Sequence, residues 1–289
     1  MTESLLWRGV SAARRPAPVV LGAMPLVHSE RLRKRWRYVG VYGERLMVCA
    51  GVVQVGLAGQ TFWAVWDRER GVLRERTRLW RGTRYVRLPH TGVHVRDGDV
   101  AVELGFVAEP GGGRAPTPVE TVSPVDGGTA WMWTRKTGGV RLRGTVTLGG
   151  ERVALDARGV IDESAGYHPR HTDWQWSAGV GALRDGRAVA WNLVAGIHDD
   201  PDASERTVWV DGVPEQLPPA TFAADLSGVA CGGDGRLAFA QEAVRSRSEN
   251  FGAIRSDYTQ PFGTFSGTLG GGLELGEAYG VMERHSALW

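Results

Sequence analysis

The stretch RLRGTVTLGGERVAL occupies residues 141–155 and carries the pattern that decides the fold. Apolar or small residues alternate with polar ones as far as Gly149-Gly150, and apolar residues recur at Val153 and Leu155. A period of two places the two kinds of side chain on opposite faces of a strand. A pair of glycines accepts the positive φ angles that a tight hairpin requires. The stretch therefore predicts two antiparallel strands joined by a two-residue turn.

Turns of the same kind recur along the chain. Asp-Gly pairs at 97–98, 185–186 and 211–212 separate β-prone runs, and they favour tight hairpins. The 41 glycines and 14 prolines interrupt the sequence too often for long helices. Many short strands at this spacing are typical of antiparallel sheets that fold into sandwiches or barrels. We therefore expect an all-β protein with little helix.

The composition is that of an ordinary globular protein, with 42% hydrophobic and 23% charged residues. The 34 basic residues nearly balance the 32 acidic ones, and the net charge of +2 predicts no nucleic-acid partner. Two cysteines, Cys49 and Cys231, are too few for a disulfide framework. The sequence has no apolar run long enough for a membrane span and no secretory signal pattern, so we expect a cytoplasmic protein.

The densest group of polar and aromatic residues is DESAGYHPRHTDWQW at 162–176. Trp174 and Trp176 have the same parity, so they face the same side of the strand predicted there. A carboxyl group beside such an aromatic wall is poorly solvated, its pKa rises, and it can act as a general acid. This makes Asp162 a candidate catalytic acid. The alternative is that the two tryptophans are core residues and that the polar residues cover the open end of a barrel.

Two histidines, His168 and His171, lie in the same segment and are candidates for positioning water or relaying a proton. Zinc requires three or four ligands, and His198-Asp199-Asp200 would have to complete a site with them. The sequence lacks HExxH, Cys-x-x-Cys, Walker A and Rossmann patterns. We therefore expect no metal and no cofactor.

The residues from Tyr279 to Trp289 alternate with a period of two and predict a closing strand. Val281, Glu283 and His285 share one face of that strand. If this face lines a pocket, Glu283 is a second candidate acid and His285 a candidate ligand-binding residue. If it does not, the two residues belong to an exposed polar ladder, and the sequence leaves both possibilities open.

The one basic run is RLRKRWRY at 31–38. Basic residues between aromatic ones occur in proteins that bind nucleic acid or anionic membrane surfaces. The same pattern also suits the start of a strand whose arginines lie along its rim or pair with carboxylates. No other basic segment supports the first interpretation, so we expect the second and leave peripheral membrane contact open.

Several motifs together resemble the family called domain of unknown function 2804, over nearly all of residues 30–289. The motifs are RKRW at 33–36, WDR at 66–68, TRK at 134–136, the block at 162–176, NL at 192–193, QPFGTFSG at 260–267 and the end at 280–289. That family is in turn similar to a lipocalin-like group that includes carotenoid 1,2-hydratases, AttH-like proteins and fungal Diels-Alderases. The elements shared with this group lie at 144–150, 159–162, 174–176 and 183–186.

The resemblance implies two consecutive antiparallel lipocalin-like β-barrel or half-barrel domains, with a pocket between or within them. We place an N-terminal extension at residues 1–29, the first domain at 30–155 and the second at 156–289. The resemblance also implies a hydrophobic small molecule as the partner. Fold alone does not decide whether that molecule is changed or only carried.

Two functions therefore compete. The first is an enzyme that hydrates, isomerises or cyclises a polyene- or terpenoid-like substrate by acid catalysis, with Asp162 or Glu283 as the acid. The residues expected to bind its ligand are Tyr167, Trp174, Trp176, Asn192 and His285. The second is a carrier for a lipid or another hydrophobic metabolite. A titratable side chain with a shifted pKa inside the pocket favours the enzyme, and a purely apolar cavity favours the carrier.

Overall fold

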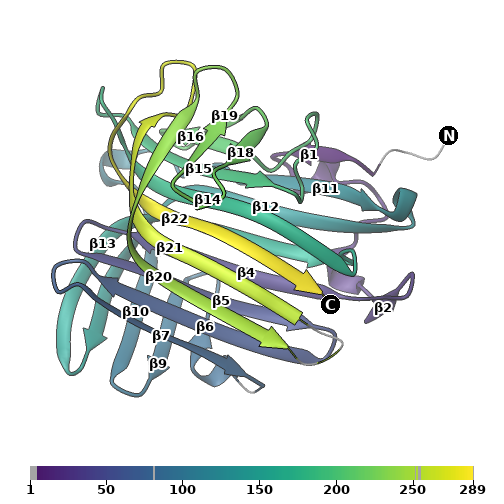
Figure 1. Ribbon diagram of the computed structural model, residues 1–289, viewed down its shortest axis with the longest axis horizontal. Helices are drawn as coiled ribbons and strands as arrows, with labels where there is room; N and C mark the ends of the chain where they lie inside the picture. The colour runs from purple at the N-terminus through teal and green to yellow at the C-terminus, as the bar shows by residue number, and fades with distance from the viewer. Residues whose placement is uncertain (1–4, 81, 251, 253–254, 289) are drawn as a thin grey trace.

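The computed structural model describes residues 5–80, 82–250, 252 and 255–288. Within these residues the regular structure consists of antiparallel strands and 3-10 turns, with no α-helix. Two curled sheets contain nearly all the strands (Figure 1). This arrangement confirms the prediction of an all-β protein with two lipocalin-like half-barrels. No helix in the described part of the chain is long and apolar enough to cross a membrane.

The first sheet has eleven strands, in the order β7-β6-β5-β4-β13-β12-β10-β9-β8, with β11 paired to both β12 and β1. Its strands are β1 (Trp7–Gly9), β4 (Lys34–Tyr42), β5 (Leu46–Val55), β6 (Ala58–Asp67), β7 (Val72–Leu79), β8 (Val86–Arg87), β9 (Gly92–Asp97), β10 (Val100–Val107), β11 (Val119–Val125), β12 (Ala130–Leu148) and β13 (Glu151–Gly166). A separate hairpin consists of β2 (Val27–His28) and β3 (Arg31–Leu32). The 3-10 turns are η1 (Ala12–Arg14), η2 (Leu21–Ala23), η3 (Gly82–Arg84), η4 (Pro110–Gly112) and η5 (Asp126–Gly128).

The second sheet has nine strands, in the order β17-β16-β15-β14-β22-β21-β20-β19-β18. Its strands are β14 (His171–Leu183), β15 (Ala188–Ala195), β16 (Thr207–Val210), β17 (Val213–Gln216), β18 (Ala220–Phe222), β19 (Gly228–Cys231), β20 (Arg236–Asn250), β21 (Arg255–Thr268) and β22 (Leu275–Leu288). The predicted closing strand is thus β22, and Trp289 lies outside the described residues. The chain passes between the sheets at residues 167–170, while the domain bounds 30–155 and 156–289 stay predictions.

The turn predictions hold in detail. Strands β12 and β13 form a hairpin around Gly149 and Gly150, whose φ angles are 58° and 91°. The Asp-Gly pairs at 97–98, 185–186 and 211–212 join β9 to β10, β14 to β15 and β16 to β17. In the last pair both residues have positive φ, at 49° and 79°. Positive φ at both positions matches the twist of the flanking strands.

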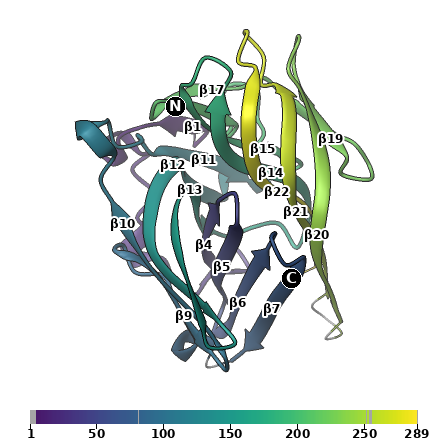
Figure 2. The same cartoon turned by 90° about the vertical axis from the view of Figure 1, so that its left-hand side faces the viewer.

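Each sheet curls around a core of its own (Figure 2). In β4, Val39 and Val41 point into the core of the first sheet, whereas Tyr38 and Tyr42 belong to a third cluster that contains residues of both sheets. In β15, Trp191 points into the core of the second sheet, and Ala190 and Val194 belong to the shared cluster. One face of each of these strands therefore contributes to the core of its own sheet, and the other face contributes to the cluster between the sheets.

The arginines of the basic run are used within the fold. Arg31 pairs with Asp126 at 2.5 Å, and Arg37 pairs with Glu163. The side chains of Arg33 and Arg35 donate hydrogen bonds to the backbone oxygens of Met24 and Leu21. These contacts hold the N-terminal segment against the beginning of β4. They agree with the prediction that the arginines lie at the start of a strand and pair with carboxylates.

The contact between Trp209 and Gly138 tests the packing of one sheet on the other. Trp209 of β16 is buried, donates its indole N–H to the backbone oxygen of Thr117 at 2.8 Å, and lies against Gly138 of β12. A Cβ at position 138 would lie 2.4 Å from the indole. We expect Gly138→Ala to lower the free energy of unfolding by about 1–3 kcal/mol, because the ring must move out of a filled space.

Urea denaturation followed by circular dichroism measures this change, with Gly105→Ala in β10 as the matched control. At position 105 the nearest atom to an added Cβ is 3.9 Å away. This variant should keep the wild-type stability or gain slightly, because alanine restricts the unfolded chain. Equal stability of the two variants would show that the Trp209 contact does not constrain the sheets.

Candidate functional site

A cavity of about 440 Å³ lies between the two sheets. Its size is within the range of about 300–1,000 Å³ that is typical of small-molecule sites. Strands β4–β7, β12 and β13 line it from the first sheet, and β14, β15 and β20–β22 line it from the second. Its walls are mainly apolar and aromatic, and include Tyr38, Phe62, Trp174, Trp176, Ile197 and Tyr258.

The position of this cavity follows from the alternation of side chains along each strand. Trp174 and Trp176 face the same side of β14, as predicted, and both line the cavity. That side is the gap between the sheets, and not the inside of a barrel, because residues such as Val41 and Trp191 fill the inside of each curled sheet. Of the two places that the resemblance allowed for a pocket, the chain uses the one between its sheets.

Glu283 is a buried carboxyl group in the wall of the cavity. It lies opposite Trp176 in the register of β14 and β22. Trp174 donates its indole N–H to Oε1 at 2.8 Å, and Gln260 donates its amide N–H to Oε2 at 3.0 Å. Burial raises the pKa of Glu283 to about 7, although the hydrogen bonds from Trp174 and Tyr258 act in the opposite direction.

His285 lies two residues further along the same face of β22, and it also lines the cavity. Its ring centroid is 4.3 Å from that of Trp174, and its Nε2 is 2.8 Å from the hydroxyl of Ser256. Burial lowers the pKa of His285 to about 4, so the ring is neutral at neutral pH. Val281 of the same face belongs to the cluster shared by both sheets. The predicted face therefore looks into the cavity and is not an exposed ladder.

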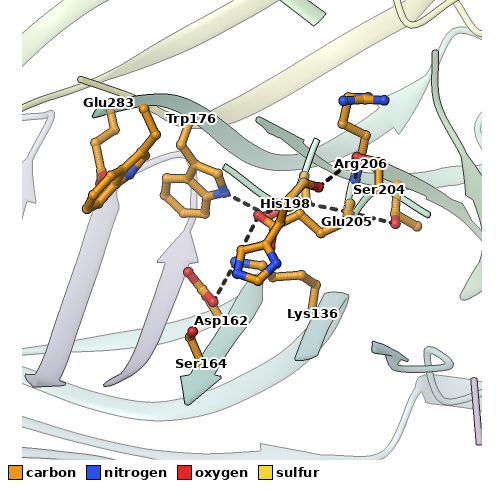
Figure 3. A network of polar contacts seen from close by, with 12 residues as sticks. Lys136, Asp162, Ser164, Trp176, His198, Ser204, Glu205, Arg206 and Glu283 are labelled. Atoms are coloured by element: carbon orange, nitrogen blue, oxygen red, sulfur yellow. Dashed lines mark hydrogen bonds and ion pairs between the residues drawn. The ribbon is translucent and has the colours of Figure 1, made fainter. Parts of the chain in front are cut away.

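Asp162 also lines the cavity, where it forms part of a buried ion cluster with Lys136 and Glu205 (Figure 3). The Lys136 Nζ atom is 2.5 Å from Asp162 Oδ1 and 3.1 Å from Glu205 Oε1. Lys136 and Asp162 are direct cross-strand partners in β12 and β13, so the register alone brings them together. Burial raises the pKa of Asp162, and Lys136 opposes the rise. Burial alone would lower the pKa of Lys136, but the two carboxylates outweigh it and raise that pKa.

Asn192 lies outside the cavity lining and forms hydrogen bonds to Trp176 and Glu205, which line the cavity. Its side-chain oxygen accepts the indole N–H of Trp176 at 2.7 Å, and its amide donates to the backbone oxygen of Glu205 at 3.1 Å. Asn192 is buried and is not among the residues that line the cavity. It therefore orients Trp176 and Glu205, which do line it.

The remaining predicted residues lie elsewhere. His168 is buried against the ring of Trp36, with centroids 4.8 Å apart, and burial lowers its pKa. His171 is exposed and pairs with Asp173 at 3.2 Å. Tyr167 is buried and donates its hydroxyl to the backbone oxygen of Pro25 at 2.9 Å. The structure thus brings Asp162, Trp174, Trp176, Glu283 and His285 to one cavity, and leaves Tyr167, His168 and His171 outside its lining.

No group of three or more His, Cys, Asp or Glu side chains in the described ranges is arranged to hold a metal ion. His168 and His171 differ in environment, since one is buried and the other lies on the surface. They do not converge on His198, which lines the cavity and is 6.3 Å from His168 between ring centroids.

Sequence reasoning missed Lys136, Glu205 and Gln260. One signal for Lys136 was available, because it and Lys34 are the only lysines in a chain with 34 basic residues, and both are buried. Glu205 lies in the irregular segment between β15 and β16, where no periodicity indicates which side chains point inward. Gln260 lies in a motif that supported the family resemblance but carried no chemical signal of its own.

The fold is similar to that of an AttH-like protein from Nitrosomonas europaea, with 16% sequence identity, a TM-score of 0.51, and coverage of 93% of this chain and 98% of that one. Weaker similarities connect it to kievitone hydratase from Nectria haematococca (12% identity, TM-score 0.46) and to CghA with Sch210972 (9% identity, TM-score 0.39), each with 89% of this chain and 88% of the other covered. At these identities the likeness concerns the fold alone.

No curated protein matches the sequence. A family described as Domain of unknown function (DUF2804) matches residues 113–289, which is more than half of the chain. The match confirms the resemblance that the motifs indicated over residues 113–289, while the motifs at 33–36 and 66–68 lie outside it. The chain therefore belongs to the DUF2804 family.

Proposed function

We propose that this protein binds a hydrophobic small molecule in the cavity between its sheets and that Glu283 donates a proton to it. The observation that carries the proposal is a buried carboxyl group in an aromatic cavity, with a pKa of about 7. A general acid is most effective when its pKa lies near the working pH. An unpaired carboxyl at the surface would be ionised at that pH and would have no proton to give.

The walls of the cavity support an apolar substrate, of the polyene- or terpenoid-like class. Rings from both sheets, among them Tyr38, Phe62 and Trp176, offer broad apolar surfaces, and burying a ligand against them removes apolar area from water. The electron-rich faces of such rings also stabilise positive charge in a bound molecule. The same walls therefore suit both the resting substrate and a cationic intermediate.

The proposed chemistry begins with transfer of the Glu283 proton to a carbon–carbon double bond. The substrate then carries a positive charge and Glu283 becomes a carboxylate. Addition of water, loss of a neighbouring proton or attack by a second double bond completes a hydration, an isomerisation or a cyclisation. In each case the proton released by the product returns to Glu283. Trp174 and Gln260 hold the carboxyl in one orientation throughout.

The different environments of the two carboxyl groups support different roles for them. Asp162 pairs with Lys136 at 2.5 Å, so its negative charge has a partner. Glu283 forms no salt bridge among the described residues, and its hydrogen-bond partners there are the neutral donors Trp174, Gln260 and Tyr258. The charge of Arg245, which also lines the cavity, lowers the pKa of Glu283 but does not outweigh burial. We therefore assign the acid to Glu283, and to Asp162 the orientation of Lys136 and of the polar end of the cavity.

A carrier without chemistry is the second candidate. It is favoured by the hydrogen bonds that both oxygens of Glu283 accept, because a carboxyl fixed in this way also serves as a structural group. The two candidates differ in whether the bound molecule is converted. The following experiments separate them.

The first experiment tests the raised pKa of Glu283 without a ligand. Below pH 4.5 both the folded and the unfolded protein hold this proton, and between pH 4.5 and about 7 only the folded protein holds it. Stability due to this group therefore falls as the pH rises through that window. Relative to Glu283→Gln, the wild type should lose about 3 kcal/mol of unfolding free energy between pH 4.5 and 7.5.

Urea denaturation at intervals of one pH unit measures the difference. Glu215→Gln makes the same chemical change at an exposed position of β17 and serves as the control. We expect its unfolding free energy to vary with pH as in the wild type. A Glu283→Gln profile parallel to the wild type would mean that Glu283 ionises normally and would refute its assignment as the acid.

The second experiment identifies the ligand and its fate. Native mass spectrometry of the protein from its own host should show a bound hydrophobic molecule. Wild-type protein should convert added substrate, and Glu283→Gln should bind it but convert it at least 100-fold more slowly, as expected when a general acid is lost. Val53→Trp, which fills the cavity from β5, should bind none. Release of the molecule unchanged by the wild type identifies a carrier, and equal conversion by Glu283→Gln refutes the acid.

A further inference from the structure

The ion cluster gives the cavity a polar end, formed by Lys136, Asp162, Glu205 and His198. Besides Asp162 Oδ1, which forms the ion pair with Lys136, two atoms at this end make no hydrogen bond within the described part of the chain, namely Glu205 Oε2 and His198 Nε2. The side chain of Glu205 is 3% exposed, and His198 as a residue is 5% exposed. Both residues line the cavity, while the two unpaired atoms are themselves buried, so a ligand group that reaches them must lie against the wall at this end.

Both side chains are fixed by contacts through their other polar atoms. Lys136 binds Glu205 Oε1 at 3.1 Å, and Ser123 Oγ lies 3.0 Å from His198 Nδ1. A buried polar atom without a partner costs about 1–3 kcal/mol, and a ligand group that pairs with it recovers this cost. The two unpaired atoms therefore mark this end of the cavity as a candidate site for a polar group of a ligand.

The charges of the cluster select the kind of group that fits. One ammonium, from Lys136, faces two carboxyl groups, from Asp162 and Glu205, so the cluster carries no surplus positive charge. An anionic head group would meet carboxylate oxygen and be repelled. A group that donates a hydrogen bond would satisfy Glu205 Oε2, and a hydroxyl can also accept one from His198 Nε2.

We propose that the ligand carries a hydrogen-bond-donating head group, a hydroxyl or an ammonium, which binds Glu205 Oε2 and His198 Nε2. The inference rests on the proposed binding of an apolar molecule in this cavity and names the class of that molecule as an amphipathic alcohol or amine. In Figure 3 Glu205 and Glu283 lie on opposite sides of Trp176. A ligand anchored at Glu205 therefore extends past Trp176, and the bond that receives the proton lies away from its head group.

Binding of 1-decanol, methyl nonyl ether, decylamine and decanoic acid, followed by tryptophan fluorescence and calorimetry, tests the inference. Decanol and the ether are isomers, but only the alcohol donates a hydrogen bond. Decanol should bind roughly tenfold or more tightly than the ether, because one hydrogen bond to a charged group is gained. Decylamine binding more tightly than decanol identifies an ammonium site, and the reverse order identifies a hydroxyl site.

Glu205→Gln replaces one carboxylate oxygen with an amide N–H and keeps the size of the side chain. The preference for decanol over the ether should fall to within about twofold, and this ratio is insensitive to a general loss of affinity. Glu249→Gln is the matched control, since Glu249 also lines the cavity but pairs with Arg247 at 2.5 Å, away from the cluster. It should keep the wild-type ratio.

The outcomes separate the inference from the proposed function. Equal binding of decanol and the ether by the wild type, or tightest binding of decanoic acid, overturns the donor site and leaves the apolar cavity as the binding site. An unchanged ratio in Glu205→Gln also overturns it. Failure of all four probes to bind overturns the proposed function itself, and the inference with it.

Discussion

The structure depends on strands that are buried on both faces. In β4, alternate residues serve two cores, because Val39 and Val41 belong to the core of the first curled sheet while Tyr38 and Tyr42 belong to the cluster shared with the second sheet. The same division holds in β15 between Trp191 and its neighbours. The period of two in a strand makes this division unavoidable, and a shift of register by one residue would exchange the two sets of side chains. The position of the cavity follows from it, since the cavity forms where the facing sides of the sheets do not fill the space between them.

This position also explains the chemistry of the site. A charge that is moved from water into such a gap loses solvation, so it needs a partner or it changes its proton occupancy. Lys136 and Asp162 meet the first condition through their cross-strand pairing. Glu283 meets the second condition, because it forms hydrogen bonds to neutral donors, and burial raises its pKa to about 7 despite the opposing charge of Arg245. One cavity therefore holds a carboxyl group that is paired and another that retains its proton.

Local patterns predicted much of this correctly. The hairpin at Gly149-Gly150, the shared face of Trp174 and Trp176, and the shared face of Glu283 and His285 all follow from periodicity and turn chemistry. Periodicity cannot tell which of two buried faces borders a cavity, because both are apolar. Periodicity also cannot predict the contact between Glu205 and Lys136, because Glu205 lies in an irregular segment and the contact joins the two sheets. The loop between β13 and β14 also has no periodicity, so nothing in the block 162–176 distinguished exposed His171 from buried His168.

The two sheets share one strand order, in which the earliest strand of the main path pairs with the latest: β4 with β13, and β14 with β22. Each sheet is therefore completed by joining segments far apart in sequence, as in the pairs Tyr38–Asp162 and Ala178–Val281, which is a slow step in folding. During synthesis on the ribosome, β22 emerges after the other strands of both sheets, and it carries Glu283. The nascent protein thus has its aromatic walls from β4 to β14 before it has its buried carboxyl group, and the cavity acquires its acid only when the C-terminal strand is inserted.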